Sequence, residues 1–174
     1  GFGFLKSFTA GFLTTCGLTA VGSPCEDDGE VLPLHGTIAN TPAEHVWWEE
    51  NDDELLVHAT VRDGSLFGRK LVLRRTIYLA KFENRLSLHD EITNDGDCES
   101  PLMVLYHMNM GYPLLSEKTE LTVNSMRVEP RDEVAAAGID SWDTMLPPTP
   151  GFAEQCFYHT FDGEASVRVY NPDI

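Results

Sequence analysis

Hydrophobic and polar positions alternate with a period of two over several short stretches of this chain, a pattern typical of β-strands. The pattern is clearest over residues 70–81. One side of the strand expected there carries four apolar residues: Leu71, Leu73, Ile77 and Leu79. We therefore predict a strand over residues 70–81.

Several other stretches predict strands on the same grounds, with turn residues between them. They are residues 12–15, 55–62, 85–93, 102–113, 120–128, 155–161 and 165–170. The last two are expected to pair as a closing hairpin that turns at Asp162 and Gly163. A loop is expected through the glycines and proline of residues 22–29, and Glu133–Ala137 is expected to form one helical turn.

No stretch has the period of a long amphipathic helix. Short strands separated by turn chemistry indicate an all-β fold of antiparallel sheets, stacked or closed on themselves. The 174 residues are enough for one domain with a sizeable core. We therefore predict a single β-sandwich domain over residues 1–174.

The strand predicted over residues 102–113 changes character along its length. Period two places His107 and Asn109 on one face, and Tyr106 on the other. The face of His107 is apolar at first and polar at its end, where a pocket could open. A histidine there could exchange a proton near neutral pH, although a core histidine bonded to a neighbour gives the same pattern.

A second histidine lies in the stretch Leu34–Asn40, between two prolines. Gly36 tolerates backbone conformations that other residues resist, so the loop can turn tightly beside His35. Asn40 closes this stretch and could contact the same ligand as His35.

Charge and cysteine content narrow the function classes. The net charge of −16, from 28 acidic and 12 basic residues, argues against nucleic acid and anionic membrane as partners. No apolar run is long enough to span a membrane, and residues 2–18 lack the features of a signal peptide. The four cysteines lack C-x-x-C spacing, which suits reduced thiols in a cytoplasmic protein; a Cys16–Cys25 bridge is the alternative.

A metal centre is the other chemistry that histidines suggest. His35, His107 and His159 could converge as three ligands, but no two of them have close ligand spacing. We therefore expect no metal and no other cofactor.

A set of motifs in chain order resembles a known family. The motifs are Leu13–Leu18, Leu34–Gly36, Asn40–Pro42, Asn84–Leu86, Asp90–Asn94 and Tyr106–Asn109. Together they resemble the galactose mutarotase-like (aldose 1-epimerase) superfamily, and within it the DUF4432 group. The resemblance covers residues from about 11 to about 170, while Leu-His-Gly alone would be a weak motif.

The resemblance implies a large antiparallel β-sandwich that binds a sugar in a cleft on one sheet. It implies that His107 is the general acid that protonates the ring oxygen, and that His35 is the second cleft histidine, which orients the sugar. Asn109 would then lie close enough to contact a hydroxyl group. Tyr106 could stack on a sugar face, or it could belong to the core.

Two departures from the family pattern concern the missing parts of the site. The family's general base is a late glutamate whose counterpart would follow Ile174, and an arginine that contacts the sugar would precede the first motif. The chain is therefore expected to be an internal fragment of a longer protein, with an incomplete sandwich. Expressed alone, it is expected either to self-associate through an open strand edge or to bind sugar weakly, and not to catalyse mutarotation. Within the chain, Glu154, Glu26 and Asp162 are the candidate substitute bases.

The function predicted from these residues is that of an aldose 1-epimerase-like protein acting on a small sugar. Mutarotation needs a base to deprotonate the anomeric hydroxyl and an acid to protonate the ring oxygen, and a histidine suits the acid. One alternative is a carbohydrate-binding β-sandwich that has lost the base. Another is a structural β-domain with no ligand.

Overall fold

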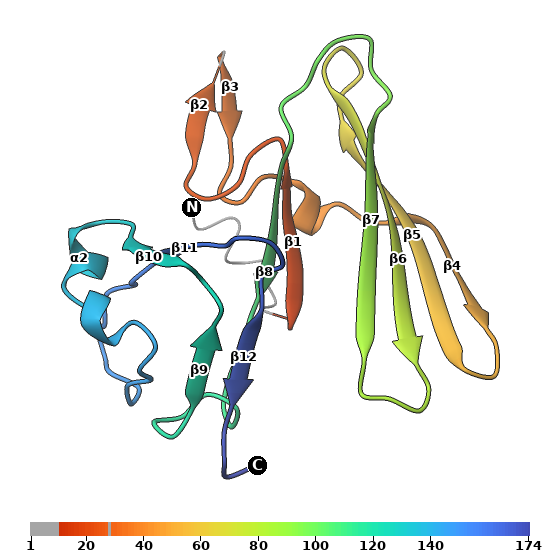
Figure 1. Cartoon of the computed structure of the whole chain (residues 1–174). Helices are drawn as coiled ribbons and strands as arrows, with labels where there is room; N and C mark the ends of the chain where they lie inside the picture. The colour runs from red at the N-terminus through yellow and green to blue at the C-terminus, as the bar shows by residue number, and fades with distance from the viewer. Residues whose placement is uncertain (1–10, 28) are drawn as a thin grey trace. The chain divides into compact units, whose positions relative to one another are not determined.

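The computed structural model describes residues 11–27 and 29–174, which divide into two compact units, Gly1–Asn109 and Met110–Ile174. We describe each unit by itself. Both are built from short strands, and the pairings between their named strands are all antiparallel (Figure 1). The predicted fold class, mostly β with antiparallel sheets, is confirmed. The prediction of one domain over the whole chain stays a prediction.

The first unit contains a four-stranded sheet in which each strand pairs with the next along the chain (Figure 1). Its strands are β4 (Glu44–Glu50), β5 (Glu54–Gly64), β6 (Lys70–Ala80) and β7 (Leu86–Asn94). The strand predicted over residues 70–81 is β6, an inner strand that pairs with β5 on one side and with β7 on the other.

A two-stranded sheet covers part of one face of the four-stranded sheet. It pairs β1 (Leu13–Leu18) with β8 (Met103–Met108), and the short 3-10 helix η1 (Ile38–Asn40) packs beside it. The core cluster between these layers consists of Leu18, Ile38, Leu71 and Leu73, with Val61, Ile92 and Val104 packed against it. The first unit is thus a two-layered sandwich around a small core.

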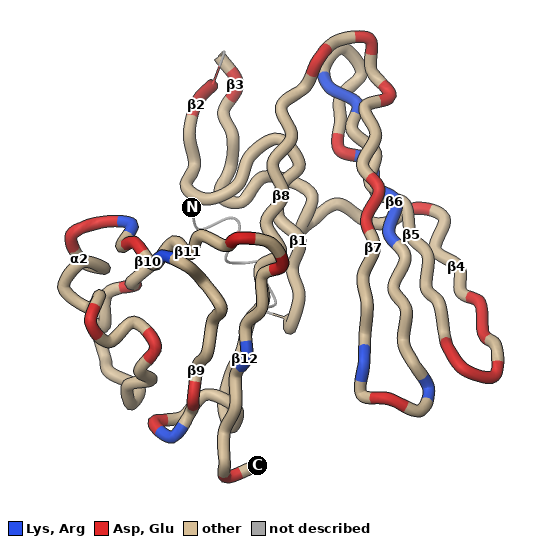
Figure 2. The backbone as a smooth tube through the Cα atoms, viewed as in Figure 1, with Lys and Arg blue, Asp and Glu red and all other residues tan. Residues whose placement is uncertain are grey.

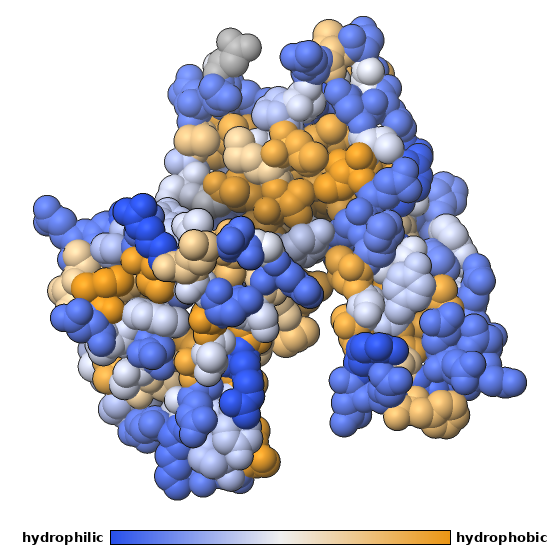
Figure 3. All heavy atoms as spheres, viewed as in Figure 1, coloured by the Kyte–Doolittle hydropathy of each residue, from blue (hydrophilic) through white to orange (hydrophobic). Residues whose placement is uncertain are grey.

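The apolar face of the larger sheet extends beyond this core. Further along β6 and β7, Leu79 and Leu86 pair across the strands and are 42% and 54% exposed. Side chains of β1, β7 and β8 line an open, apolar cleft there: Phe12, Leu13, Asn84, Leu86, Leu88, Tyr106 and Met108. Apolar side chains also gather over β1 and β8 (Figure 3).

The prediction of a loop over residues 22–29 is wrong for the middle of that stretch. A small exposed hairpin forms there from β2 (Cys25–Asp27) and β3 (Glu30–Leu32). Gly29 has a φ of +76°, which a glycine adopts without strain at the turn. Cys16 and Cys25 are both free thiols, as are the other two cysteines.

The second unit consists of two further strand pairs. β9 (Glu120–Val123) pairs with β12 (Val167–Tyr170), and β10 (Arg127–Pro130) pairs with β11 (Phe157–Thr160). The helix α2 (Glu133–Ala136) confirms the predicted helical turn, and the 3-10 helix η2 (Ile139–Ser141) follows it.

Two strand predictions for this unit are wrong. The strand expected over residues 120–128 is broken at Asn124, whose side chain bonds the Ser166 amide at 2.7 Å and the Glu164 carbonyl at 2.9 Å instead of continuing a ladder. The hairpin expected over 155–161 and 165–170 does not form, because β11 and β12 pair with β10 and β9 respectively. Alternation predicted the strands but carried no information on their partners.

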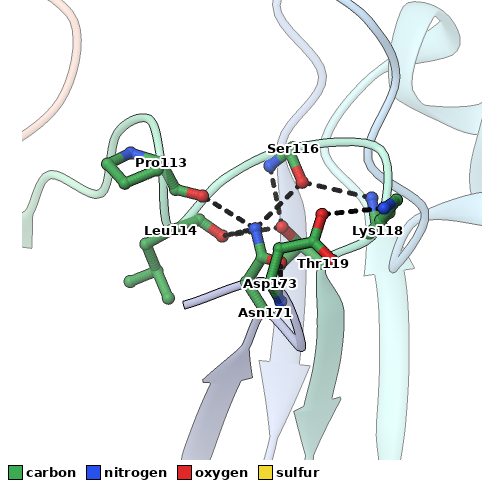
Figure 4. A network of polar contacts seen from close by, with 7 residues as sticks. All are labelled: Pro113, Leu114, Ser116, Lys118, Thr119, Asn171 and Asp173. Atoms are coloured by element: carbon green, nitrogen blue, oxygen red, sulfur yellow. Dashed lines mark hydrogen bonds and ion pairs between the residues drawn. The ribbon is translucent and has the colours of Figure 1, made fainter.

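A buried asparagine closes the second unit (Figure 4). Asn171 is 3% exposed, and its amide donates to the Pro113 carbonyl at 2.7 Å and to the Ser116 hydroxyl at 2.9 Å. Lys118 pairs with Asp173 at 2.8 Å beside it. These contacts fasten the segment after β12 to the loop before β9.

Acidic residues outnumber basic ones, and several of them follow one another at the turn between β4 and β5 (Figure 2). Within residues 11–27 and 29–174, no helix is both long and apolar enough to cross a membrane.

Candidate functional site

The turn that carries His35 has an unusual backbone. His35 has a φ of +60° and Gly36 a φ of +73°, so two consecutive residues lie in the left-handed region. For a residue with a side chain this conformation costs roughly 1–3 kcal/mol, and it persists where the surroundings enforce it. At Gly36 a Cβ atom would collide with the carbonyl oxygens of Gly17 and Ala20, which explains the glycine.

Backbone hydrogen bonds hold this turn against the edge of β1. The Gly17 amide donates to the His35 carbonyl at 3.1 Å, and the Thr37 amide donates to the Gly17 carbonyl at 3.0 Å. The two bonds flank Gly36, which forms an isolated parallel bridge with Gly17. His35 is therefore fixed relative to β1 although it lies in a loop.

Gly22 fixes the imidazole ring of His35. The His35 amide donates to the Gly22 carbonyl at 2.9 Å, and the Gly22 amide donates to Nδ1 of His35 at 3.2 Å. A backbone N–H can only donate, so Nδ1 acts as the acceptor and the proton of the neutral ring lies on Nε2. His35 thus presents Nε2–H as a hydrogen-bond donor.

His107 lies next to His35. It is on β8, directly opposite Thr14 of β1, and the two histidine rings meet edge to face with centroids 5.5 Å apart and an interplanar angle of 86°. Both residues are half-buried. The structure therefore brings together the two histidines that the sequence singled out, from segments far apart along the chain.

The two candidate asparagines, Asn109 and Asn40, have different surroundings. The Asn109 side chain donates to the Gly11 carbonyl at 2.8 Å, and its backbone amide donates to the Phe12 carbonyl at 2.9 Å, so it fastens the end of β8 to the start of β1. Asn40 is the exposed last residue of η1, and its amide donates to the Thr37 carbonyl at 3.2 Å.

Tyr106 lies on the opposite face of β8 from His107, as the period of two requires. Its hydroxyl donates to Oδ2 of Asp90 at 2.8 Å. Burial raises the pKa of the Tyr106 phenol, and the hydrogen bond to Asp90 raises it further. The structure thus does not bring Tyr106 together with the histidine pair.

Asp90 also forms the ion pair that joins the two layers on this face. The Arg75 guanidinium donates from Nε to Oδ1 at 2.7 Å and from Nη2 to Oδ2 at 2.6 Å, a two-pronged geometry. Nη2 of Arg75 also donates to the Thr15 hydroxyl at 2.7 Å. The Asp90 side chain is 4% exposed, so its charge is compensated by these partners.

Glu154 belongs to the second unit. Its carboxylate pairs with Arg131 at 3.1 Å, and its side chain is 76% exposed. The hydrogen bonds to Asp132 and to Glu154 raise the pKa of Arg131. Glu154 is therefore engaged in a surface ion pair.

His159, the third histidine weighed for a metal site, also lies in the second unit. Its Nδ1 is 3.0 Å from the Ser125 hydroxyl, and the ring packs edge to face on Trp142. In the part of the chain that the structure describes, no three histidine, cysteine or acidic side chains gather as a metal site requires. The expectation of no metal remains to be tested.

Sequence reasoning missed the residues that hold the site in place, Gly22 and Asp63. Asp63 of β5 is 5% exposed and accepts hydrogen bonds from the Leu18 amide and the Thr37 hydroxyl. An acidic residue at the end of a predicted strand was the available signal, but the same signal marks many solvated turns.

The antiparallel strands and the adjacent histidines agree with the expected likeness to galactose mutarotase-like proteins. In agreement, the chain matches a crystal structure of a “putative aldose 1-epimerase” from Klebsiella pneumoniae with a TM-score of 0.89 and 27% sequence identity. The match covers 98% of this chain and 46% of that one, so this chain spans less than half the length of that protein.

The family follows from a sequence model. The model of a domain of unknown function, DUF4432, matches residues 1–173, and the chain belongs to this family. A comparison with curated proteins finds no match. The resemblance inferred from the motifs is thereby confirmed.

Proposed function

We propose that this protein takes part in the interconversion of sugar anomers, as an aldose 1-epimerase-like isomerase with His107 as its general acid. The observation that carries the proposal is the His35–His107 pair, with ring centroids 5.5 Å apart. Similarity to a structure described as an aldose 1-epimerase supports the same chemistry.

In the proposed reaction His107 acts in its protonated form. It donates a proton to the ring oxygen of the sugar while a base removes the proton of the anomeric hydroxyl, and the bond between C1 and the ring oxygen breaks. Rotation about C1–C2 and the reverse transfers close the ring on the other face. Two proton transfers balance the reaction, so it needs no cofactor and no metal.

His35 is proposed to orient the sugar by hydrogen bonding. The Gly22 amide occupies its Nδ1, which favours a neutral ring with Nε2–H as a donor to a sugar oxygen. Asn109 would contribute a polar contact at the end of β8. The resemblance implies that the base is a glutamate.

A sugar-binding protein without catalysis is the second candidate. The observation that favours it is the state of Glu154, the first substitute base within the chain, whose carboxylate is already paired with Arg131. In this alternative the histidines would bind a sugar without opening its ring.

Polarimetry separates the candidates. Freshly dissolved α-glucose and α-galactose are followed as they relax, with and without the protein, and tryptophan fluorescence is titrated with the same sugars. Acceleration of the relaxation supports the isomerase, and binding without acceleration supports the binding protein. Neither effect with any aldose of a panel would contradict both.

A further inference from the structure

We propose that Asp63 is a positioning residue that holds His35 in its orientation toward His107. The inference rests on the proposed function, because the orientation of His35 matters for a sugar that contacts both rings. Asp63 lies at the far end of β5, and no part of its side chain is needed for the chemistry itself.

The Asp63 carboxylate accepts hydrogen bonds from β1 and from the turn that carries His35. Its Oδ2 accepts from the Leu18 amide at 3.1 Å, and its Oδ1 accepts from the Thr37 hydroxyl at 2.7 Å. Leu18 follows the residue to which the His35 turn is bonded, and Thr37 is two residues beyond His35. Asp63 therefore joins β5 to β1 and to the turn at once.

These contacts close a ring of hydrogen bonds. The Thr37 hydroxyl donates to Asp63, and the Thr37 amide donates to the Gly17 carbonyl. Leu18, the residue after Gly17, donates its amide to Asp63 and so completes the ring. The ring flanks the bond from the Gly17 amide to the His35 carbonyl. His35 has a left-handed backbone that relaxes unless its neighbours restrain it, and Asp63 supplies that restraint on the C-terminal side.

A carboxylate suits this place better than a neutral group. Two separate donors point at it, and one carboxylate can accept from both without supplying a proton. It is 5% exposed, so water does not compete for either bond. Gly22 holds the amide and the ring of His35 independently, so loss of the Asp63 contact should displace the His35 turn relative to His107 and not detach the loop.

Thr37 offers the least disruptive test, because it is exposed and its hydroxyl can be removed without changing its shape. Thr37→Val removes the donor to Asp63, Thr37→Ser restores it, and Thr41→Val removes a nearby hydroxyl that donates to the Thr37 carbonyl instead. The first readout uses protein with 15N-labelled histidine and no sugar. The ring signals of His35 should move or broaden in Thr37→Val and return in Thr37→Ser, and Thr41→Val should leave them unchanged.

The second readout is the sugar. If the wild type binds or isomerises an aldose, Thr37→Val should raise Kd or KM about tenfold, the effect of one lost hydrogen bond, with a smaller change in kcat. Absence of any aldose activity in the wild type would contradict the proposed function alone, because the histidine signals still decide the role of Asp63.

A purely structural role would lower Tm without moving the His35 signals below the transition, and that result would overturn the proposal. Asp63→Asn is the second variant should Thr37→Val fail to fold. An amide cannot accept from both Leu18 and Thr37 in the same way, so the same displacement of the His35 signals is expected. Unchanged signals in a folded Asp63→Asn protein would equally contradict the proposal.

Discussion

The two faces of β8 use polar side chains for different ends. On one face His107 meets the ring of His35, which a loop with a left-handed backbone presents. On the other face, one residue away, Tyr106 donates to Asp90, which Arg75 grips with two nitrogens. Neighbouring residues of one strand therefore belong to a candidate reaction site and to a structural joint.

The two faces of β8 differ in the kind of group that bonds their polar side chains. At Asp90 a full charge of each sign is present, and the pair links β6, β7, β1 and β8. At the histidine pair a neutral backbone group, the Gly22 amide, donates to Nδ1 of His35 and fixes its ring.

The largest expected effect is on the His107 face. In the intact protein, His107→Ala should lower kcat by about two to four orders of magnitude, the usual loss for a general acid. Polarimetry measures it, and circular dichroism checks the fold. A kcat close to the wild-type value would remove His107 from the mechanism and end the distinction between the faces.

Loss of the Arg75–Asp90 ion pair on the opposite face should lower the free energy of unfolding. Arg75→Met leaves the buried Asp90 carboxylate without its main partner, at a cost of about 3 kcal/mol in the free energy of unfolding. Arg74→Met is the matched control on the neighbouring residue, since Arg74 is exposed and bonds only the Thr93 hydroxyl among the contacts described. Urea unfolding compares them, and equal losses would show that Arg75 is no special joint.

Tyr106→Phe removes one hydroxyl oxygen and tests whether Tyr106 acts in stability or in catalysis. Removing the hydroxyl deletes the bond to Asp90 and should cost about 1–2 kcal/mol of unfolding free energy, because the acceptor is charged. The value of kcat should stay within about twofold of the wild type, since Tyr106 points away from His107. A large fall in kcat with unchanged stability would assign Tyr106 to the reaction site.

The Tyr106 face also borders the apolar cleft, and we predict that the exposed apolar side chains there promote self-association of the chain. Leu86→Lys places a charge in this cleft at a side chain that is 54% exposed. We expect weaker self-association by size-exclusion chromatography at several concentrations, with little change in Tm. Leu66→Lys, an exposed loop residue outside the cleft, is the control. A wild-type chain that is monomeric at every concentration would show that the cleft drives no association.

The smallest expected effect is that of chelation. Treatment with EDTA should leave sugar binding and any activity unchanged, because the proposed proton transfers use no metal. Metal analysis of the purified protein accompanies the measurement. A stoichiometric metal that is lost together with activity would overturn this reading of the histidine face.

The sequence predicted the elements whose signal is local. Alternation located β5, β6 and β7 to within a few residues, and period two correctly separated His107 from Tyr106. The pairing of β11 with β10 was not predictable, because it depends on where Asn124 directs the chain and not on either strand's pattern. The proximity of His35 and His107 came from the family resemblance and from no spacing in the chain.

The positions of Gly22 and Asp63 were beyond local reasoning for a related reason. Their roles are hydrogen bonds to residues 13 and 45 positions away along the chain. A glycine and an aspartate at such places read as an ordinary loop and an ordinary strand end. Only the folded chain brings Gly22 to His35, and Asp63 to Leu18 and Thr37.

The hydrogen bond from Asn171 to the Pro113 carbonyl affects the order in which parts of the chain fold. It spans 58 residues, whereas the β5–β6 and β6–β7 hairpins join neighbours in sequence. Contacts that close short loops form early, and long closures follow. During synthesis on the ribosome the β5–β6 and β6–β7 hairpins can therefore form first. The bond to the Pro113 carbonyl forms only after Asn171 has left the ribosome. Hydrogen exchange on nascent chains would record that delay as late protection of the Asn171 side-chain amide, which donates to the Pro113 carbonyl.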